Sequence, residues 1–410
     1  MEKEISMNFY LVLAILLIFP LGQLTRLTLF SPEVHIYWHD LMLIALLSYY
    51  LIILFKRKRT FDFKLVRPII SFFAVGAFSL FLNSYRFFPQ ARFNLAGLQG
   101  RTLLISSLYL FRWMVYAGIF FIARRFGKKQ KKKALDYMIF AGVVSAFFGL
   151  AQYFFFPDAR SLVSSGWDPH LYRVIGTFLD PGYTGLIYVF TLVLIVDRAY
   201  RIDRVNRTDR TNKIKITGWR LAAGGCYSAF ALSYARSAYL AFLVAVWTIA
   251  YLRKSVKFAL VMSLLLAFTL VVLPRPAGEG VRLERQNSIW SRFDSWQKAI
   301  SIWREKPIFG IGFNTYRYVQ AGKGFLSKNW EESHAGAGAD ASLLFVLATT
   351  GVTGLTVYSS LLSTMFRLAF KKRSFLLLPT LTAVFIHSFF NNSLFYPWVM
   401  VWIWVLTGCI

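Results

Sequence analysis

The stretch ALDYMIFAGVVSAFFGLAQYFFF, at residues 134–156, contains one charged side chain, that of Asp136. A helix of this length extends about 35 Å, which is enough to cross the ~30 Å hydrocarbon layer of a membrane. Similar apolar blocks occupy residues 36–55 and 258–273. We therefore predict an all-α, polytopic membrane protein.

The composition of the 410-residue chain excludes several other classes of protein. Hydrophobic residues make up 57% of it and charged residues only 16%, whereas about 25% charged residues is usual in soluble proteins. This excludes a soluble enzyme, a nucleic-acid-binding protein and a disordered chain. The net charge of +28 comes from basic residues between the apolar blocks. The two cysteines, Cys226 and Cys409, lie in separate segments and offer no disulfide framework.

We predict a single membrane domain over residues 1–410, with about twelve transmembrane helices. The first segment is expected to be a retained helix, because no small-residue cleavage pattern follows it and another apolar block comes soon after. The predicted spans are residues 8–29, 36–55, 66–83, 102–123, 134–156, 182–199, 218–234, 236–252, 257–273, 340–366, 374–392 and 394–409.

Basic residues distinguish the two sides of this domain. The loops after even-numbered spans, with their flanks, carry 28 Lys and Arg residues, whereas the short loops after spans 1, 3, 5 and 7 carry seven. Because basic loops stay inside, both termini and the even loops are predicted to be cytoplasmic. Two basic stretches, residues 124–133 and the arginines at every third residue from Arg198 to Arg210, could also contact anionic lipid headgroups. Orientation alone is the interpretation we favour.

The segment at residues 274–339, between spans 9 and 10, is predicted to be a large external loop. Its apolar residues at 289, 290, 293, 296, 299, 300 and 303 fall on one side of a helix that ends before Pro307. Arg292, Asp294 and Lys298 lie on the other side. We expect this amphipathic helix to lie along the outer membrane interface and to close the lipid-facing side of a cavity.

Two arginines on the predicted outer side are candidates for binding a ligand. Arg173 lies just before span 6, and Arg236 lies in the short turn between spans 7 and 8. A guanidinium group forms bidentate, permanently charged hydrogen bonds with phosphate oxygens, so the pair suits a diphosphate. The alternative is that each arginine simply extends toward the lipid headgroups.

Other polar groups in the spans receive structural interpretations. His35 and His39 have a spacing that a metal ion could use, but aromatic residues adjoin them, and an interfacial aromatic belt is the favoured interpretation. Three residues of span 11 are expected to hydrogen-bond between helices: His387, Asn391 and Asn392. No cofactor and no metal site is predicted.

Four segments, all predicted to be on the outer side, resemble the bacterial O-antigen ligase and O-antigen polymerase superfamily. They are RVIGTFLDP at residues 173–181, SYARSA at 233–238, WQKAISIWREKPIFGIGFN at 296–314 and DASLLFVLATTGVTG at 340–354. The topology resembles that of the family over the whole chain, while the similar motifs are confined to about a hundred residues.

The resemblance implies a metal-independent membrane glycosyltransferase in the bacterial cytoplasmic (inner) membrane. Such an enzyme transfers a glycan from an undecaprenyl-diphosphate carrier to an acceptor hydroxyl at the outer face. The resemblance also implies that Arg173 and Arg236 hold the diphosphate, whose charge arginines neutralise in a low-dielectric site. The expected partners are the lipid-linked glycan, an acceptor glycan, glycolipid or protein, and the bilayer, with no nucleic acid.

The catalytic base is where the sequence departs from the family. Many relatives have a His-Asn pair about eleven positions before the residue that matches Gly351, where this chain has Asp340 and Ala341. His334 lies six residues earlier. Either side chain could accept a proton, and Asp340 is preferred by position. Alternatively, Asp340 caps the helix that follows it and His334 is a solvated loop residue.

Two other classes of function compete with a transferase. A transporter or flippase of polyisoprenoid-linked glycans would also use many spans and outward arginines. The sequence lacks internal repeats, paired broken helices and charges near span centres other than Arg112, which argues against it. The third possibility is a non-catalytic partner in an envelope assembly.

Overall fold

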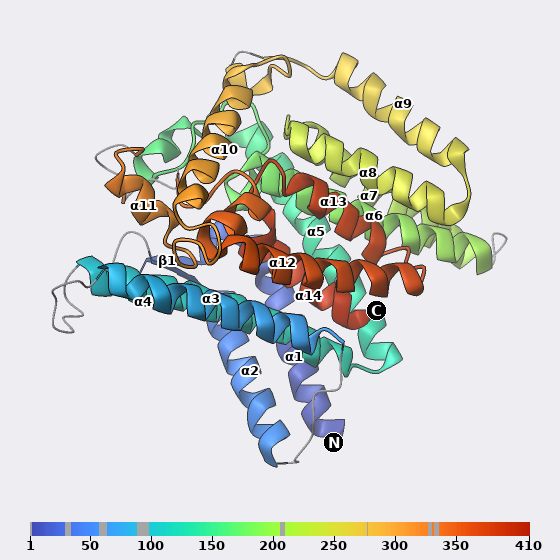
Figure 1. Ribbon diagram of the computed structural model, residues 1–410. Coiled ribbons are helices and arrows are strands. Elements are labelled where there is room, and N and C mark those ends of the chain that lie inside the picture. Colours follow the sequence, from blue (N-terminus) through green and yellow to red (C-terminus); the bar gives the residue numbers. More distant parts are fainter. Residues whose placement is uncertain are drawn as a thin grey trace.

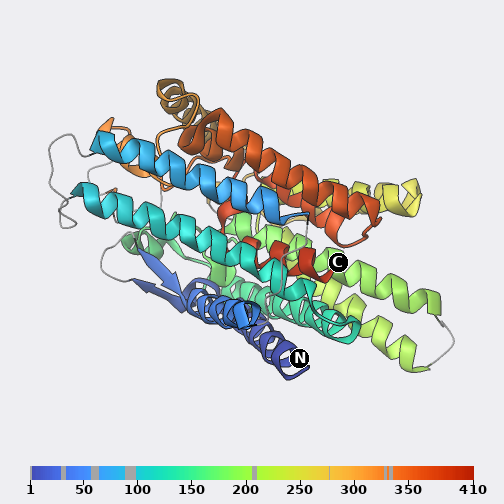
Figure 2. The same ribbon diagram turned by 60° about the horizontal axis from the view of Figure 1, so that its bottom comes forward.

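The computed structural model describes residues 2–28, 34–56, 64–87, 98–205, 210–276, 278–326, 330–331 and 336–410. Within these ranges almost all regular structure is helical, and the helices form one bundle (Figure 1). The helices α3, α4 and α12 run side by side along it, as both ribbon views show (Figures 1 and 2). The all-α class predicted from the sequence is confirmed.

Each of the twelve predicted spans contains a helix of the described chain. These helices are α1 (Glu2–Ile18), α2 (Trp38–Lys56), α3 (Val66–Phe87), α4 (Leu98–Arg124), α5 (Lys128–Phe155), α6 (Pro181–Val205), α7 (Arg210–Ala231), α8 (Arg236–Arg253), α9 (Val256–Val272), α12 (Ser342–Lys371), α13 (Leu377–His387) and α14 (Pro397–Cys409). Six of them, α1 with its extension, α3, α4, α5, α6 and α12, are long and apolar enough to cross a membrane. A multi-pass membrane protein is thus supported, while the count of twelve spans stays a prediction.

Smaller elements lie between these helices. The segment between α9 and α12, predicted above to be external, contains α10 (Asn287–Glu305) and α11 (Tyr316–Gly322), which lie at one end of the bundle (Figure 1). A two-stranded antiparallel hairpin, β1 (Arg26–Thr28) and β2 (His35–Tyr37), was not predicted from the sequence. Five short 3-10 helices complete the described structure: η1 (Phe19–Thr25), η2 (Arg160–Ser165), η3 (Gly176–Phe178), η4 (Glu279–Val281) and η5 (Ser393–Phe395).

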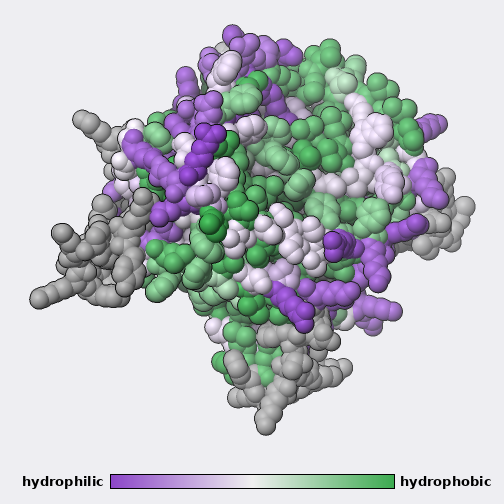
Figure 3. Space-filling view, viewed as in Figure 1, coloured by the Kyte–Doolittle hydropathy of each residue, from purple (hydrophilic) through white to green (hydrophobic). Residues whose placement is uncertain are grey.

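The surface of the bundle separates apolar from polar side chains. In Figure 3 hydrophobic residues cover much of its middle, and hydrophilic residues gather over α10 and α11 and again at the opposite end. The exposed side chains of α9 are an example of the apolar part, with Phe268 67% and Val271 80% exposed. An apolar band between two polar ends is what a bilayer requires of a spanning bundle.

Close helix contacts fix α6 in the interior of the bundle. Its residues 186–190 are fully buried. A Cβ added at Gly142 of α5 would lie 1.9 Å from Thr191 Oγ1, and one at Gly185 would lie 2.7 Å from Ala238 Cβ of α8. Glycines at such contacts let membrane helices approach closely. The approach of α6 to α8 brings the segment after Arg173 next to the turn that holds Arg236.

Two of the segments that resemble the O-antigen ligases contact each other at a break in α12. Gly351 has φ 68° and ψ −169°, a non-helical conformation inside the helix. The residues before the break accept hydrogen bonds, Ile311 N donating to Ala348 O (3.1 Å) and Gly312 N to Thr349 O (3.0 Å). After it, Val352 N donates to Pro307 O (2.9 Å). The loop at residues 307–312 is therefore locked into α12.

This joint leaves no room for a side chain at its centre. A Cβ at Gly351 would lie 2.2 Å from the carbonyl oxygen of Ile308. On the other side of the joint, Ser79 of α3 donates to Thr349 O (2.9 Å) and Asn83 donates to Gly310 O (3.0 Å). Protein groups therefore occupy both sides of the break in α12. Their hydrogen bonds hold the loop that follows α10 against α12 and α3.

The charge expected near a span centre has a buried partner. Arg112 of α4 forms a 2.6 Å ion pair with Asp40 of α2 and also donates to the carbonyl oxygen of His35. The hydroxyl of Tyr116 donates to the other oxygen of Asp40 (2.6 Å). A buried ion pair is tolerated when its remaining hydrogen-bonding groups are satisfied in this way.

Candidate active site

A cavity of about 850 Å³ lies at the end of the bundle where α10 and α11 are found. It brings together residues from distant parts of the sequence, namely Arg173, Asp180, Arg236, Arg292 and Asp340. The two arginines and the aspartate singled out from the sequence therefore line one cavity. Its volume falls within the range of roughly 300–1,000 Å³ that small-molecule sites occupy.

Arg173 supports the turn that carries the second arginine. It is 8% exposed and lies just before η3 and α6. Its guanidinium group donates from Nε to Ser233 O (3.0 Å) and from Nη2 to Tyr234 O (3.2 Å). Tyr234 has a φ of 49°, an uncommon value for a residue with a side chain. Arg173 thus stabilises a strained turn two residues before Arg236.

Arg236 is the first residue of α8, and its side chain connects this helix to the segment between α9 and α12. Its Nη1 donates to Leu283 O (3.1 Å) and to Arg285 O (3.0 Å), and its Nη2 donates to the hydroxyl of Ser288. Arg285 in turn donates to Gly280 O (2.7 Å). These bonds hold the start of α10 over the cavity.

The clustered arginines destabilise one another's charge. Burial first, and then the neighbouring Arg285, lower the pKa of Arg173 to about 9. Burial, Arg236 and Arg292 lower the pKa of Arg285 to about 10. Burial also lowers the pKa of Arg292. All four guanidinium groups stay protonated near neutral pH. A bound polyanion would offset the free-energy cost of burying them and would reduce their mutual repulsion.

Arg292 reaches the cavity from the polar side of α10. Its Nε donates to Phe390 O (3.2 Å), and its guanidinium carbon lies 5.7 Å from the centre of the Phe390 ring. The same side of α10 presents to the cavity a row of polar residues: Ser288, Ser291, Ser295 and Lys298. The aromatic side faces away, with Trp290 67% exposed. The amphipathic helix expected from the sequence therefore covers the cavity with its serines and cations, and the aromatic residues do not form the lining.

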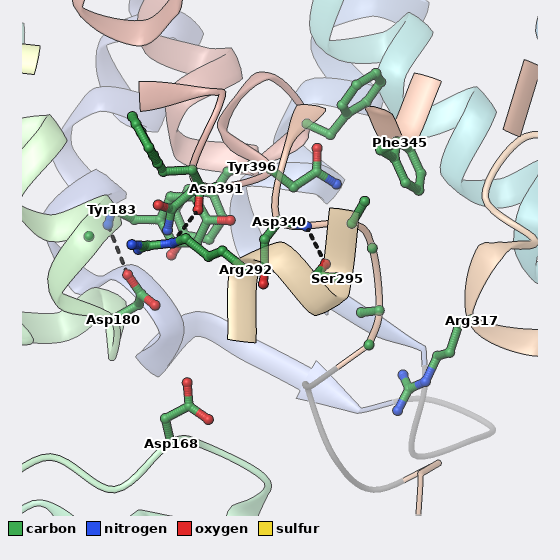
Figure 4. Close-up of a pocket in the computed structure, with 18 of the residues that line it drawn as sticks. Asp168, Asp180, Tyr183, Arg292, Ser295, Arg317, Asp340, Phe345, Asn391 and Tyr396 are labelled. Carbon is green, nitrogen blue, oxygen red and sulfur yellow. Dashed lines mark hydrogen bonds between the residues drawn. The ribbon is translucent and has the colours of Figure 1, made fainter. Parts of the chain in front are cut away.

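Asp340 lies two residues before α12, beside Arg292 and Ser295 (Figure 4). Its backbone N–H donates to Ser295 Oγ (3.1 Å). Burial raises the pKa of the Asp340 carboxyl to about 6, although Arg292 opposes the rise. The N-cap residue of α12 is Ala341, and no side-chain hydrogen bond caps this helix. The capping role considered for Asp340 is therefore not observed.

Two more carboxyl groups face the same space (Figure 4). Asp180 accepts a hydrogen bond from Tyr183 N (2.9 Å) at the start of α6, and burial raises its pKa. Asp168 lies on the loop that follows α5. Both carboxylates contribute to the raised pKa of Asp340. The cavity thus combines a surplus of arginines with one carboxyl group that titrates near neutral pH.

His334, the second base candidate, lies outside the described residues, as do the other residues from 332 to 335. Its place relative to the cavity is therefore not part of the described geometry. Of the two candidates, Asp340 is the one whose position the structure describes, and it lies at the arginine cluster.

Of the three residues of span 11, His387 forms the expected contact between helices. His387 of α13 hydrogen-bonds through Nε2 to Ser237 of α8 (3.1 Å) and through Nδ1 to Ser393 (2.6 Å). Asn391 and Asn392 line the cavity. Their buried Oδ1 atoms have no hydrogen-bond partner among the described residues, so they are available to accept hydrogen bonds from a ligand.

His35 and His39 lie in different environments. His35 accepts a hydrogen bond from Arg26 Nε (3.1 Å), whereas His39 stacks on Tyr37 with 5.3 Å between ring centres and also contacts Trp398. An aromatic cluster therefore accounts for His39. In the part of the chain that the structure describes, no group of three or more His, Cys, Asp or Glu side chains is placed to hold a metal ion.

The sequence analysis did not select Arg285 and Arg292 as site residues. Arg292 had a usable signal, because the polar residues of its helix recur at intervals of three or four, as they do on one side of a helix. Arg285 lies in a loop without periodicity, and only the fold brings it to Arg236. Asp180 was visible within the segment at residues 173–181 but was not assigned a role.

Comparison with known protein families identifies one part of the chain. No curated protein matches it. Residues 221–359 match the family model described as O-Antigen ligase. This range contains Arg236, Arg285, Arg292 and Asp340 of the cavity, while Arg173 lies before it. The family that the sequence motifs indicated, the O-antigen ligase and polymerase superfamily of membrane glycosyltransferase-like proteins, is confirmed over this part of the chain.

Proposed function

We propose that this protein transfers a glycan from undecaprenyl diphosphate to an acceptor hydroxyl at the outer face of the cytoplasmic membrane. One observation carries the proposal: Arg173, Arg236, Arg285 and Arg292 are among the arginines that line a single cavity with the carboxyl group of Asp340. A diphosphate ester supplies the polyanion that such a cluster favours, and a sugar joined to it supplies the reacting carbon.

The arginines would bind the diphosphate in a fixed orientation. A guanidinium group has five N–H donors. Arg173 uses two hydrogen bonds on backbone carbonyls of the turn, and Arg236 makes three bonds to the external segment. Each therefore keeps further donors for phosphate oxygens while its position is already set. Donors that are preorganised in this way stabilise charge as it develops on a leaving group.

The proposed reaction is a displacement at the anomeric carbon of the glycan. The acceptor oxygen forms a bond to this carbon while the bond to the diphosphate oxygen breaks, and the diphosphate leaves with the electron pair. The Asp340 carboxylate takes the proton of the acceptor hydroxyl, for which a pKa of about 6 is suitable near neutral pH. His334 is the second candidate for this role.

The glycan has potential partners beside the arginines. The free Oδ1 atoms of Asn391 and Asn392 can accept hydrogen bonds from sugar hydroxyl groups. Tyr183 and Tyr396 stack 3.8 Å apart at the wall of the cavity and offer an aromatic surface. Polar acceptors that fix orientation on a partly aromatic wall are common in sites for small organic ligands.

Reconstitution of the purified protein tests the proposal. Proteoliposomes receive a purified undecaprenyl-diphosphate oligosaccharide and candidate acceptors, without nucleotide and with EDTA. We expect glycosylated acceptor and an equal amount of free undecaprenyl diphosphate, both of which should be lost in the Arg236→Ala variant. Movement of the intact lipid-linked glycan between leaflets without cleavage would instead support the transporter alternative.

A further inference from the structure

A second cavity, of about 720 Å³, lies at the opposite ends of the helices that form the first one. Its walls come from the start of α5, the end of α6, the turn between α12 and α13, and the end of α14. Seven basic residues line it: Lys128, Lys131, Lys132, Arg198, Arg201, Lys372 and Arg373. The charge count predicts that this end faces the cytoplasm.

Part of this charge is neutralised within the protein and part is not. Arg201 pairs with Asp197 (2.7 Å), and Arg198 pairs with Asp136. Lys372 donates a hydrogen bond to the backbone oxygen of Ile410 (2.6 Å). The three lysines of α5 and Arg373 form no ion pair within the described part of the chain. The uncompensated cations therefore face the cavity from two separate segments.

The lysines also occupy an unfavourable place on their helix. Lys128 begins α5, and Lys131 and Lys132 follow as its fourth and fifth residues. The N-terminal end of a helix carries a partial positive charge, which favours anions and opposes cations there. An anion bound between these side chains would be stabilised by the lysines and by the helix end together.

The deeper wall of the cavity is apolar. Ile139, Leu194 and Leu376 are buried, and Leu135 and Phe375 are partly buried. A free phosphate ion would gain nothing from these side chains. A phospholipid offers a phosphate for the basic rim and glycerol and acyl carbons for the apolar wall, so the combination favours a lipid over a soluble anion.

Membrane orientation does not require this arrangement. The positive-inside effect depends on how many Lys and Arg residues a loop carries. Lys129 and Lys133, in the same stretch, are exposed and do not line the cavity, yet they contribute equally to that count. The gathering of Lys131, Lys132 and Arg373 around one hollow is a separate feature of the fold.

We name this second cavity the basic cavity. We propose that it binds the headgroup of an anionic phospholipid such as phosphatidylglycerol. Lys131, Lys132 and Arg373 contact the phosphate, and Leu135 and Ile139 contact the glycerol and the first acyl carbons. Basic pockets between helices at the cytoplasmic side of membrane proteins suit such headgroups. The site is independent of glycan transfer at the other end.

Native mass spectrometry of the delipidated full-length protein in detergent tests this assignment. Phosphatidylglycerol and phosphatidylcholine are titrated separately, and inorganic phosphate is added as a soluble competitor. We expect tighter binding of phosphatidylglycerol and no displacement by equimolar phosphate. The Lys131→Gln/Lys132→Gln variant should bind phosphatidylglycerol roughly tenfold or more weakly, because each basic residue near an anionic lipid surface contributes about a factor of five.

The matched control is Lys129→Gln/Lys133→Gln, which removes the same charge from the same helix and should retain binding. Thermal unfolding confirms that both variants are folded, and Arg373→Gln serves as an independent variant from the other segment. Equal affinity for the two lipids, equal loss in both double variants, or displacement by equimolar phosphate would each overturn the assignment.

Discussion

The two cavities lie at opposite ends of the same helices and hold positive charge in different ways. At the first, which we name the arginine cavity, Arg173 and Arg236 are fixed by hydrogen bonds to backbone carbonyls. At the basic cavity, Lys131 and Lys132 have no such anchors in the described chain and lie at least partly in solvent. Rigid guanidinium groups suit the stabilisation of a transition state, whereas flexible ammonium groups suit tolerant binding of a headgroup.

The largest effect is expected for the proposed base of the arginine cavity. Asp340→Asn keeps the size of the side chain and removes its basicity, so the rate of glycan transfer should fall by roughly 10² to 10⁴. Phosphatidylglycerol binding at the basic cavity should not change. The rate is measured in proteoliposomes as acceptor glycosylated per unit time.

His334→Gln is the companion variant and should cost far less. The opposite order would assign the base to His334. Near-normal turnover in both variants would remove general-base catalysis by this segment and favour a transporter.

The next effect concerns the shape of the cation. Arg236→Lys or Arg173→Lys keeps the charge but loses the fixed fork of donors, so each should raise the barrier by about 2–4 kcal/mol, as the loss of an oxyanion donor does. The measurement is kcat/KM for the lipid-linked donor. The control is Arg304→Lys, on the exposed part of α10, which should leave kcat/KM unchanged. Full activity in both cavity variants would contradict the proposed arginine clamp.

The joint at Gly351 should affect the arginine cavity alone. Gly351→Ala places a Cβ at a positive φ and 2.2 Å from Ile308 O, which should destabilise the protein by about 1–3 kcal/mol. We expect a lower midpoint of thermal unfolding and slower transfer, with lipid binding at the basic cavity retained in the folded fraction. Gly218→Ala, where an added Cβ meets nothing within 4 Å, provides the control.

The pH dependence should show the titration of Asp340. The base must be deprotonated, so the rate should fall about tenfold per pH unit below the folded-state pKa of about 6 and level off above it. This acid limb should be absent from the residual rate of Asp340→Asn. A limb that persists there and vanishes in His334→Gln would point to the histidine.

Stability should respond in the opposite direction. The folded-state pKa of Asp340 lies above its ordinary value of 3.8, so its contribution to stability is complete below pH 3.8 and is lost as the pH rises through 6. Asp340→Asn should therefore unfold at a higher temperature than the parent protein at pH 8 but not at pH 4.

The smallest effect separates the basic cavity from the arginine cavity. Lys131→Arg/Lys132→Arg changes the shape of two cations and keeps their charge, so phosphatidylglycerol affinity should be unchanged. The reverse exchange, Arg to Lys, is expected to be damaging at the arginine cavity. A large change in affinity would show that the basic cavity also depends on exact donor geometry.

Sequence patterns predicted the helical class and several residues that line the arginine cavity. Apolar blocks such as residues 134–156 predict helices because hydropathy and length are local properties, and each predicted span contains one. Arg173, Arg236 and Asp340 were selected from sequence motifs, and the structure places all three at one cavity. Their catalytic roles stay proposals.

The way in which distant polar groups combine could not be predicted, because it depends on the tertiary structure. Arg285 reaches Arg236, Asp40 pairs with Arg112, and residues 307–312 fill the break at Gly351 through contacts between segments far apart in the chain. In the sequence, the lysines of α5 indicate only membrane orientation. The fold places the turn after α12 and the end of α14 beside three of them around one cavity. Hydropathy shows which residues are polar, but it does not show which partners satisfy their hydrogen bonds and charges. Hydrogen bonds and ion pairs depend on side-chain positions, and these are set when the helices pack.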